Sequence, residues 1–293
     1  MTIPPPAEIR RIAYLGTPEL AVPPLAALVA SGYEVPLVVS RADTRRGRGG
    51  GHQPSPVKAA AEALGLRVTD DLADLAEVDA DLGVVVAYGR IIPASVLDHL
   101  AMVNIHFSLL PRWRGAAPVE RAILAGDART GVCLMAVEEG LDTGAVYRRD
   151  EIDIGPDETL DELRTRLVTL GVSQLVAALG EGLGKPTPQV GEPVYAEKLT
   201  ADERRIDWTA SAPTVHRQVR VGGAWTTFRD KRLKIHRTAL ASGSGEPGSF
   251  DGLRVMTGDG AVELVEVQPE GKPRQDAAAW RNGAQPTADD RLH

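Results

Sequence analysis

The chain has 293 residues, with 33 lysines and arginines against 40 aspartates and glutamates, so its formal net charge is −7. Hydrophobic residues make up 43% and charged residues 25% of the sequence, which is ordinary for a globular protein and excludes a collagen-like, mucin-like or wholly disordered chain. Cys133 is the only cysteine, which excludes an intramolecular disulfide and a zinc site built from cysteines. As a total, the acidic charge argues against a nucleic-acid partner.

The sequence also gives an expectation for the cellular location of the protein. Its longest apolar run, residues 82–87, is far shorter than the roughly 18–20 residues that a membrane-spanning helix needs. Residues 1–11 are rich in proline and lack the apolar core of a secretory signal. We therefore expect a cytoplasmic protein with no membrane partner, and we expect it to be a monomer.

Strands and helices are predicted to alternate as far as residue 179. Apolar runs predict strands at residues 11–15, 35–39, 66–68, 81–88, 102–107, 131–137 and 145–154. Helical patterns occupy residues 18–30, 56–64, 91–100, 118–125 and 159–179, and Asp157 is the expected N-cap of the last of them. Such alternation is typical of parallel strands joined by right-handed crossovers. The expected fold class is α/β: a Rossmann-like, mostly parallel sheet with helices on both faces.

A second, smaller domain follows. Residues 181–194 are rich in glycine, proline and glutamine, which is typical of a linker. After them, short strands are predicted at residues 206–208, 225–228, 233–236, 253–256 and 261–267, with one helix at 212–219. This pattern predicts a small OB-like β-barrel. We place the first domain at residues 1–187, a linker at 188–206 and the second domain at 207–293.

The first turn of the expected sheet does not predict a dinucleotide site. It reads Gly16-Thr17-Pro18-Glu19 and lacks the G-x-G-x-x-G pattern. Pro18 also removes a backbone N–H that a pyrophosphate would use. A nicotinamide cofactor is therefore disfavoured.

Two polar residues near the end of a predicted strand are the first candidates for chemistry. Asn104 and His106 are two residues apart, so their side chains share one face of the strand. Two donors aimed at one point can stabilise an oxyanion, and an imidazole also titrates near neutral pH. An isolated Asn-x-His is nevertheless more often an ordinary polar pair at a strand end.

Asp142 lies in a glycine-flanked turn, Gly140 to Gly144, between two later strands. A carboxylate beside an imidazole holds its tautomer and stabilises the imidazolium. The Asp-Thr-Gly triplet alone is a weak signal, because aspartic proteases share it. Those proteases need two such aspartates on paired β-lobes, which an α/β pattern does not supply.

The run NIHFSLLPRWRGAAP at residues 104–118 resembles the signature of the 10-formyltetrahydrofolate-dependent formyltransferases, and among them the enzymes that formylate methionyl-tRNA. Further matches occur, in the same order, at residues 16–18, 54–58, 85–89, 126–127, 140–144, 195–199 and 205–208. The resemblance covers most of the chain. Each piece alone is weak, but the combination is specific.

The resemblance implies transfer of a formyl group from 10-formyltetrahydrofolate to the amino group of methionine on initiator methionyl-tRNA, for translation initiation. Asn104 and His106 would bind the oxyanion of the tetrahedral intermediate. Asp142 would orient His106 and receive the proton of the amine through water. Neither a metal nor a covalent nucleophile is needed. The folate co-substrate would contact two segments, one comprising Ser108, Leu109, Leu110 and Pro111, the other Val86, Ala87, Tyr88, Gly89, Ile91 and Ile92.

The resemblance also gives a role to the basic residues. Residues 40–55 form a loop rich in glycine and arginine, which on its own predicts only a solvated loop. In the family, the matching loop probes the acceptor stem of the initiator tRNA. The expected tRNA-binding residues are Arg41, Arg45, Arg46 and Arg48 in this loop, and Arg217, Arg220, Lys231, Arg232 and Lys234 in the second domain. Trp225 and Phe228 could stack on bases, although core packing is favoured for both.

The chain departs from the family pattern in three places. Cys133 stands where many members have threonine or serine, and Phe107 stands where a small residue, often glycine, is common. The stretch at residues 220–225 is shorter than the proline-containing stretch expected in the family. Three other functions stay open: formyl transfer to a small amine such as an amino-sugar nucleotide or glycinamide ribonucleotide, hydrolysis of formyl-folate, and RNA binding with an inactive α/β domain.

Overall fold

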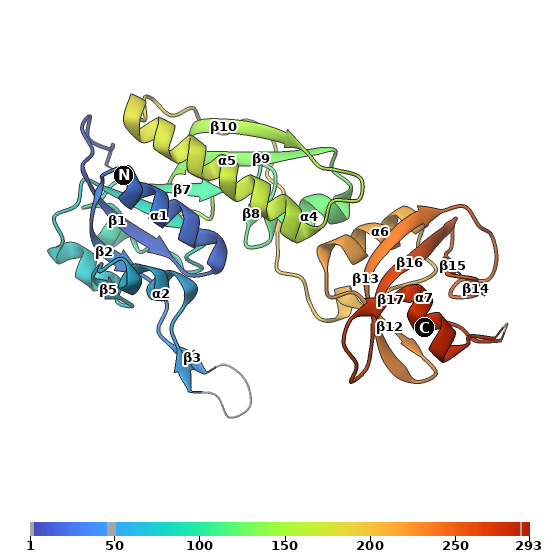
Figure 1. Cartoon of the computed structure of the whole chain (residues 1–293). Helices are drawn as coiled ribbons and strands as arrows, with labels where there is room; N and C mark the ends of the chain where they lie inside the picture. The colour runs from blue at the N-terminus through green and yellow to red at the C-terminus, as the bar shows by residue number, and fades with distance from the viewer. Residues whose placement is uncertain (1–2, 46–50, 288) are drawn as a thin grey trace. The chain divides into compact units, whose positions relative to one another are not determined.

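A computed structural model describes residues 3–45, 51–287 and 289–293 (Figure 1). The chain divides into two compact units. The first comprises residues 1–118, 129–153 and 164–196, and the second comprises residues 119–128, 154–163 and 197–293. The domain boundaries expected from the sequence stay a prediction, but residues 188–196 of the expected linker belong to the first unit.

The first unit is built on a seven-stranded sheet with the order β10-β9-β7-β6-β1-β2-β5. Its strands are β1 (Arg11–Gly16), β2 (Glu34–Val39), β5 (Val68–Thr69), β6 (Leu82–Val86), β7 (Met102–His106), β9 (Arg129–Ala136) and β10 (Val146–Asp153). The pairings among β1, β2, β5, β6 and β7 are parallel, whereas β9 and β10 run antiparallel to their neighbours. The mostly parallel α/β sheet is therefore confirmed.

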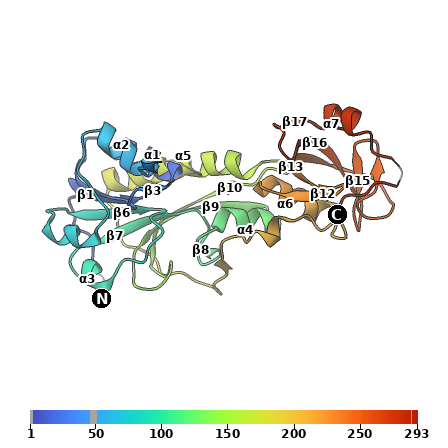
Figure 2. The same cartoon turned by 90° about the horizontal axis from the view of Figure 1, so that it is seen from below.

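Helices lie on both faces of this sheet (Figure 2). One face carries α1 (Val22–Ala30), α2 (Pro56–Ala63) and α5 (Leu160–Glu181). The other carries the short α3 (Ala94–Leu97) and the 3₁₀ helix η2 (Leu72–Glu77). Leu75 and Leu97 of these two elements pack with Ala13, Leu15 and Val39 of the sheet in one buried apolar cluster. Burial on both faces is the physical reason for the nearly continuous apolar strands.

Short elements complete the first unit. The 3₁₀ helix η1 (Glu19–Ala21) leads into α1. Two strands of two residues each, β3 (Thr44–Arg45) and β4 (His52–Gln53), pair antiparallel. A separate parallel pair joins β8 (Arg114–Gly115) to β11 (Tyr195–Ala196), so residues far apart in the sequence lie side by side.

The second unit is a curved antiparallel sheet with the order β12-β13-β16-β15-β14, and β17 pairs with β16. The strands are β12 (Trp225–Phe228), β13 (Lys231–Ala241), β14 (Phe250–Asp251), β15 (Arg254–Met256), β16 (Ala261–Pro269) and β17 (Gln275–Asp276). The helical elements of this part of the chain are α4 (Pro118–Ala125), η3 (Asp202–Arg204), α6 (Ala212–Val221) and α7 (Ala277–Ala284). Two register shifts within β13 bend the sheet, and Phe228 and Trp280 pack edge to face at 5.2 Å in its core. This architecture agrees with the predicted small barrel.

Three local predictions were wrong, and one helix was not predicted. The helix expected at residues 91–100 is reduced to α3, because Pro93 stays extended and the helix begins after it. Residues 206–208 form no strand; only Arg205 makes an isolated bridge, to Trp225. The helix α7 was missed. The N-cap of α5 is Thr159, not Asp157: its hydroxyl accepts from the Glu162 N–H, and the Glu162 carboxylate accepts from the Thr159 N–H, a capping box.

Among the described residues, no helix combines the length and the apolar character that crossing a membrane would require.

Candidate functional site

The carboxyl ends of the parallel strands form the edge at which the candidate residues meet. The chain runs from β1 to β2 on one side and later places β6 on the other side of β1, so the direction of strand addition reverses there. Open α/β sheets bind ligands outside the strand ends at such a reversal. The segment after β6 and the end of β7 both lie at this edge.

His106 and Asp142 are brought together at this edge. His106 is the last residue of β7 and is 5% exposed, and its Nδ1 lies 3.6 Å from Oδ2 of Asp142. Asn104 precedes it by two residues on the same strand and is partly exposed, so its side chain shares the face of His106. The structure thus brings His106 and Asp142 together, and the catalytic roles of all three residues stay a prediction.

The orientation of the His106 ring is set by a backbone carbonyl. Nε2 lies 2.9 Å from the carbonyl oxygen of Trp113. A carbonyl oxygen can only accept, so Nε2 carries a proton and donates it. Nδ1 is then the ring nitrogen that faces Asp142 and the space beyond it.

Asp142 is held in an unfavourable backbone conformation. Its φ is +51°, in the left-handed region that residues with a Cβ rarely adopt. Its Oδ2 accepts a hydrogen bond of 2.7 Å from the N–H of Gly115. Of the six non-glycine residues with positive φ in the described part of the chain, Ala87, Trp113 and Asp142 lie at this edge of the sheet. Such strained residues cluster at functional sites.

Gln189 is a member of this site that the sequence did not reveal. Its amide nitrogen donates to the carbonyl oxygens of Asp142 and Gly144, and its amide oxygen accepts from the guanidinium of Arg114. Nothing in a proline- and glycine-rich stretch distinguishes one glutamine as a structural contact. The pairing of β8 with β11 and the bridge between Val146 and Thr187 place its segment here.

The two expected folate segments divide into exposed and buried residues. Ala87, Gly89 and Ile91 are exposed, and the Ile91 side chain reaches 77% exposure although it is apolar. Val86, Tyr88, Ile92, Ser108 and Leu110 are buried, and Leu109 and Pro111 are partly buried. The Ser108 hydroxyl donates to the carbonyl of Arg112 at 2.6 Å and so shapes the turn. We therefore expect the exposed residues, more than the buried ones, to contact folate directly.

Comparisons with known proteins agree with this site. Residues 10–179 match the formyl transferase family, and residues 198–285 match the formyl transferase C-terminal domain. The chain belongs to the formyl transferase family. It is 48% identical to the methionyl-tRNA formyltransferase of Jannaschia sp. strain CCS1, over 94% of this chain and 97% of that protein. It is 42% identical to the methionyl-tRNA formyltransferase of Neisseria meningitidis serogroup C, over 93% of this chain and 97% of that protein.

Solved structures share the fold of this formyl transferase. HypX from Aquifex aeolicus in complex with tetrahydrofolic acid matches with a TM-score of 0.65 and 22% identity, over 94% of this chain and 47% of HypX. An N-formyltransferase from Helicobacter canadensis, in complex with folinic acid and dTDP-3-aminofucose, matches with a TM-score of 0.67 and 17% identity, over 89% of this chain and 99% of that one. At these identities the likeness concerns the fold. Within the described residues of the formyl transferase, no group of three His, Cys, Asp or Glu side chains is placed to hold a metal.

Cys133 of the formyl transferase lies directly opposite His106 in the pairing of β7 with β9. It is fully buried, and burial raises the pKa of its thiol. It packs in one cluster with Leu110 and Met135. This is a packing residue at the position where the family pattern has a hydroxyl.

The loop predicted to contact tRNA is only partly described. Arg41 is exposed, and Arg45 belongs to β3 by its backbone. Arg46 and Arg48 lie outside the described residues. At the base of the loop, Lys58 Nζ bonds Asp43 Oδ1 at 2.8 Å, and the buried hydroxyls of Ser40 and Ser55 are 2.6 Å apart. These contacts join the two ends of the loop.

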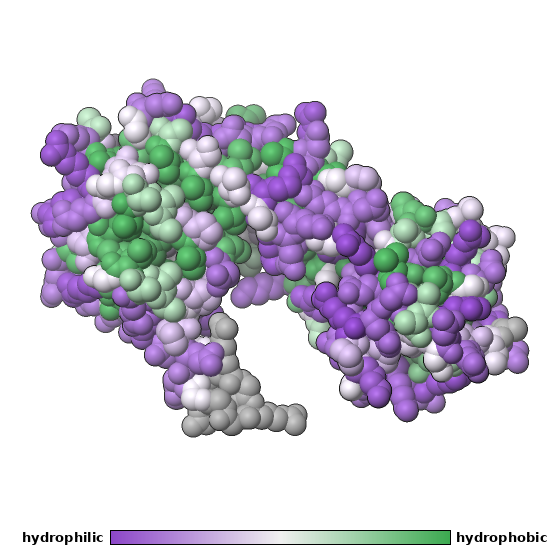
Figure 3. Space-filling view, in the orientation of Figure 1, coloured by the Kyte–Doolittle hydropathy of each residue, from purple (hydrophilic) through white to green (hydrophobic). Residues whose placement is uncertain are grey.

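Three of the predicted basic residues of the second unit are exposed on one strand. Lys231, Arg232 and Lys234 lie on β13, and the visible face of this unit is mostly hydrophilic (Figure 3). Lys234 lies opposite Trp225 in the pairing of β12 with β13. The guanidinium carbon of Arg232 is 4.1 Å from the centre of the Trp225 ring, and that of Arg205 is 5.7 Å from it. Trp225 is therefore a partly buried residue with two cations close to its ring, while Phe228 is buried.

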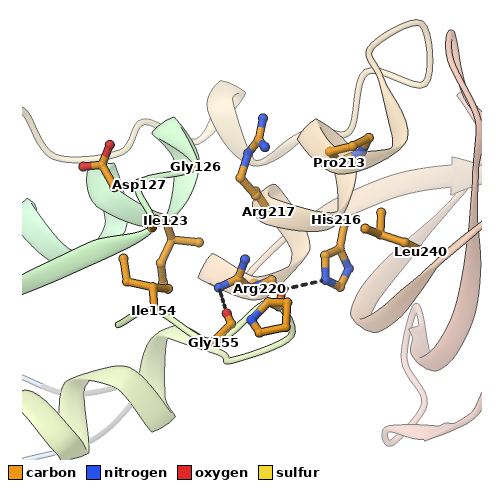
Figure 4. A pocket seen from close by; sticks show the side chains of 12 residues that line it. Ile123, Gly126, Asp127, Ile154, Gly155, Pro213, His216, Arg217, Arg220 and Leu240 are labelled. Atoms are coloured by element: carbon orange, nitrogen blue, oxygen red, sulfur yellow. Dashed lines mark hydrogen bonds between the residues drawn. The ribbon is translucent and has the colours of Figure 1, made fainter. Parts of the chain in front are cut away.

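Arg217 and Arg220 lie instead beside a cavity of about 220 Å³ (Figure 4). Arg220 is 9% exposed, and its guanidinium donates to the carbonyl oxygens of Gly155 and Glu158, both at 2.8 Å. Burial lowers the pKa of Arg220. Its donors hold the 155–158 segment against α6, so its predicted contact with tRNA has less support than that of the β13 residues.

Proposed function

We propose that this formyl transferase moves the formyl group of 10-formyltetrahydrofolate to the amino group of methionine on initiator methionyl-tRNA. The observation that carries the proposal is the match to methionyl-tRNA formyltransferases at 42–48% identity over nearly their whole length, the second unit included.

The candidate trio can perform the chemistry without a covalent enzyme intermediate. The amine nitrogen attacks the formyl carbon, and the carbonyl oxygen becomes an oxyanion. In this proposal the Asn104 amide and Nδ1 of His106 donate to that oxyanion; because the Trp113 carbonyl already engages Nε2–H, donation from Nδ1 uses the imidazolium form of the ring. Asp142, beside Nδ1, receives the proton that the amine loses, through water. The intermediate then collapses, the bond from the formyl carbon to N10 of the folate breaks, and N10 takes up the proton from Asp142 through water as tetrahydrofolate leaves.

The folate co-substrate is proposed to bind at the edge of the sheet after β6. Ala87, Gly89 and Ile91 offer exposed backbone and apolar side chains there. An apolar surface lined by backbone polar groups suits a flat heterocycle such as a pterin. The segment from Ser108 to Pro111 forms the adjacent turn.

The tRNA is proposed to contact the loop at residues 40–55 and the basic residues of β13. Guanidinium and ammonium groups bind phosphates and so position RNA without reading its sequence. Arg232 and Lys234 have no ion-pair partner among the described residues, so their charges are available for phosphates.

One assay tests the function. Purified enzyme, 10-formyltetrahydrofolate and initiator methionyl-tRNA are expected to yield formylmethionyl-tRNA. Elongator methionyl-tRNA and dTDP-amino sugars in place of the initiator are expected to react at least about a hundredfold more slowly in kcat/KM. Transfer to the small amines alone would overturn the proposal, and release of formate without any acceptor would identify a hydrolase.

A further inference from the structure

Gln189 joins the turn that carries Asp142 to the strand that binds the Asp142 carboxylate. Its Nε2 donates two hydrogen bonds of 2.8 Å, to the carbonyl oxygens of Asp142 and Gly144. Its Oε1 accepts from Nε and Nη2 of Arg114, at 3.1 and 2.7 Å. Both hydrogens and the oxygen of the amide are thus engaged.

These contacts hold the turn in a backbone conformation that it would otherwise rarely adopt. Asp142 has a φ of +51°, which a residue with a Cβ keeps only when its surroundings hold it there. Gly115, which follows Arg114 on β8, donates its N–H to Asp142 Oδ2 at 2.7 Å. The main chain of Asp142 is therefore held to β8 through Gln189, and its side chain is held to β8 through Gly115.

We propose that Gln189 is a positioning residue for formyl transfer. It fixes the 142–144 turn on β8, so that the Asp142 carboxylate stays beside Nδ1 of His106. This inference rests on the catalytic role proposed for Asp142. It does not depend on which amine accepts the formyl group.

Only an amide satisfies all three neighbours. Glutamate would keep the acceptor for Arg114, but it would lose both donors and place a carboxylate against two carbonyl oxygens. Methionine has nearly the same length and removes every hydrogen bond. Val190, the next residue, is 85% exposed and serves as the matched control position.

The first test compares Gln189→Met, Gln189→Glu and the control Val190→Ala. Both substitutions of Gln189 are expected to lower kcat by about 10- to 100-fold and to leave KM for folate and tRNA within about twofold, because the loss concerns the placement of Asp142. Val190→Ala is expected to match the wild type. An unchanged kcat in Gln189→Met, or a fully active Gln189→Glu, would overturn the proposal.

The second test asks whether Gln189 acts through Asp142. If it does, adding Gln189→Met to an Asp142→Asn variant is expected to lower the remaining kcat by no more than about twofold. The full effect of Gln189→Met in both backgrounds would mean that the residue stabilises the fold without positioning Asp142.

A third measurement needs no activity. Hydrogen exchange of the Gly115 N–H, which the Asp142 carboxylate accepts, is expected to be at least about tenfold faster in Gln189→Met than in Val190→Ala. Equal exchange would contradict the proposed positioning even if the wild type proved to formylate an acceptor other than methionyl-tRNA. The two proposals can therefore fail separately.

Discussion

Two polar neighbours and burial together fix the imidazole of His106. A carbonyl oxygen binds Nε2, a carboxylate lies 3.6 Å from Nδ1, and the side chain is almost fully buried at the end of a central strand. Donors held in advance at the position where negative charge will develop need no reorganisation during the reaction. The fixed position of His106 at the end of a central strand therefore suits the proposed role of its imidazole as a donor to the oxyanion.

The most direct prediction at the residue scale concerns Asp142. Asp142→Asn keeps the shape of the side chain and an acceptor for the Gly115 N–H, but removes the negative charge beside Nδ1 of His106. We expect kcat for formyl transfer to fall by about a thousandfold or more, in line with loss of the carboxylate from other carboxylate–histidine pairs. Steady-state kinetics measure this, and an unchanged circular dichroism spectrum is the control. Near-normal turnover would remove Asp142 from the proposed mechanism.

The sequence predicted only those site residues that carry a motif. Asn104 and His106 could be paired from strand spacing alone, and Asp142 stood out as an acid between glycines. Gln189 could not be found in this way, because its role depends on a contact across more than forty residues with a turn whose geometry is not local. A hydrogen bond from a side chain to main-chain atoms far away in the sequence produces no motif by which it could be predicted.

At the scale of elements, the long alternating segments were predictable and the short ones were not. The strands β1, β6 and β7 are mostly apolar and buried because both faces of the sheet are covered, which makes them easy to recognise in the sequence. The α7 helix was not predicted, because its eight residues contain glycine and asparagine. Its start also depends on Asp276, whose carboxylate accepts from two backbone N–H groups. Tertiary packing outweighs weak local preference in such elements.

The α6 helix supplies a prediction about pH. His216 on this helix is 3% exposed; Nδ1 lies 2.9 Å from the Thr238 hydroxyl, and Nε2 lies 3.1 Å from Asp157 and 3.3 Å from the Pro156 carbonyl. Burial lowers the pKa of His216 below its ordinary value of 6.5, although Pro156 and Asp157 oppose the shift. As the pH falls through 6.5, the unfolded chain therefore binds a proton that the folded chain does not, and folding stability decreases.

Urea unfolding at pH 7.5 and at pH 5.5 measures this effect. The free energy of unfolding of the wild type is expected to decrease more between these two pH values than that of His216→Gln, which has no imidazole to titrate. Fluorescence of the tryptophans in the second unit reports its unfolding. An equal decrease in both proteins would show that His216 does not contribute to the pH dependence.

At the scale of the whole molecule, the net charge of −7 is a poor guide to the partner. Acidic residues are frequent at residues 70–81 and 150–162, whereas arginine and lysine gather at residues 41–48 and 217–237. Charge acts on a partner over about 10 Å at ordinary salt concentration, so a local cluster decides binding and the total decides little beyond solubility. Several cations of the second cluster are already committed: Arg229 pairs with Asp290, Arg237 with Glu162, and Arg220 with backbone carbonyls.

Arg232 is a cation of the second cluster whose guanidinium has no carboxylate partner among the described residues, so its charge is available to tRNA. Trp225 holds the Arg232 guanidinium 4.1 Å from its ring without neutralising its charge or occupying its N–H donors, unlike a carboxylate partner. Arg232→Ala is therefore expected to weaken tRNA binding and to reduce the slope of log K against log salt concentration by about one, the value for one lost phosphate contact. Arg254 on β15 is also exposed, and Arg254→Ala is the matched control for the loss of one charge. Binding of initiator tRNA at several salt concentrations measures both variants. Equal slopes for Arg232→Ala and the wild type would exclude Arg232 from the tRNA interface, because a phosphate contact cannot be lost without changing the number of counterions released.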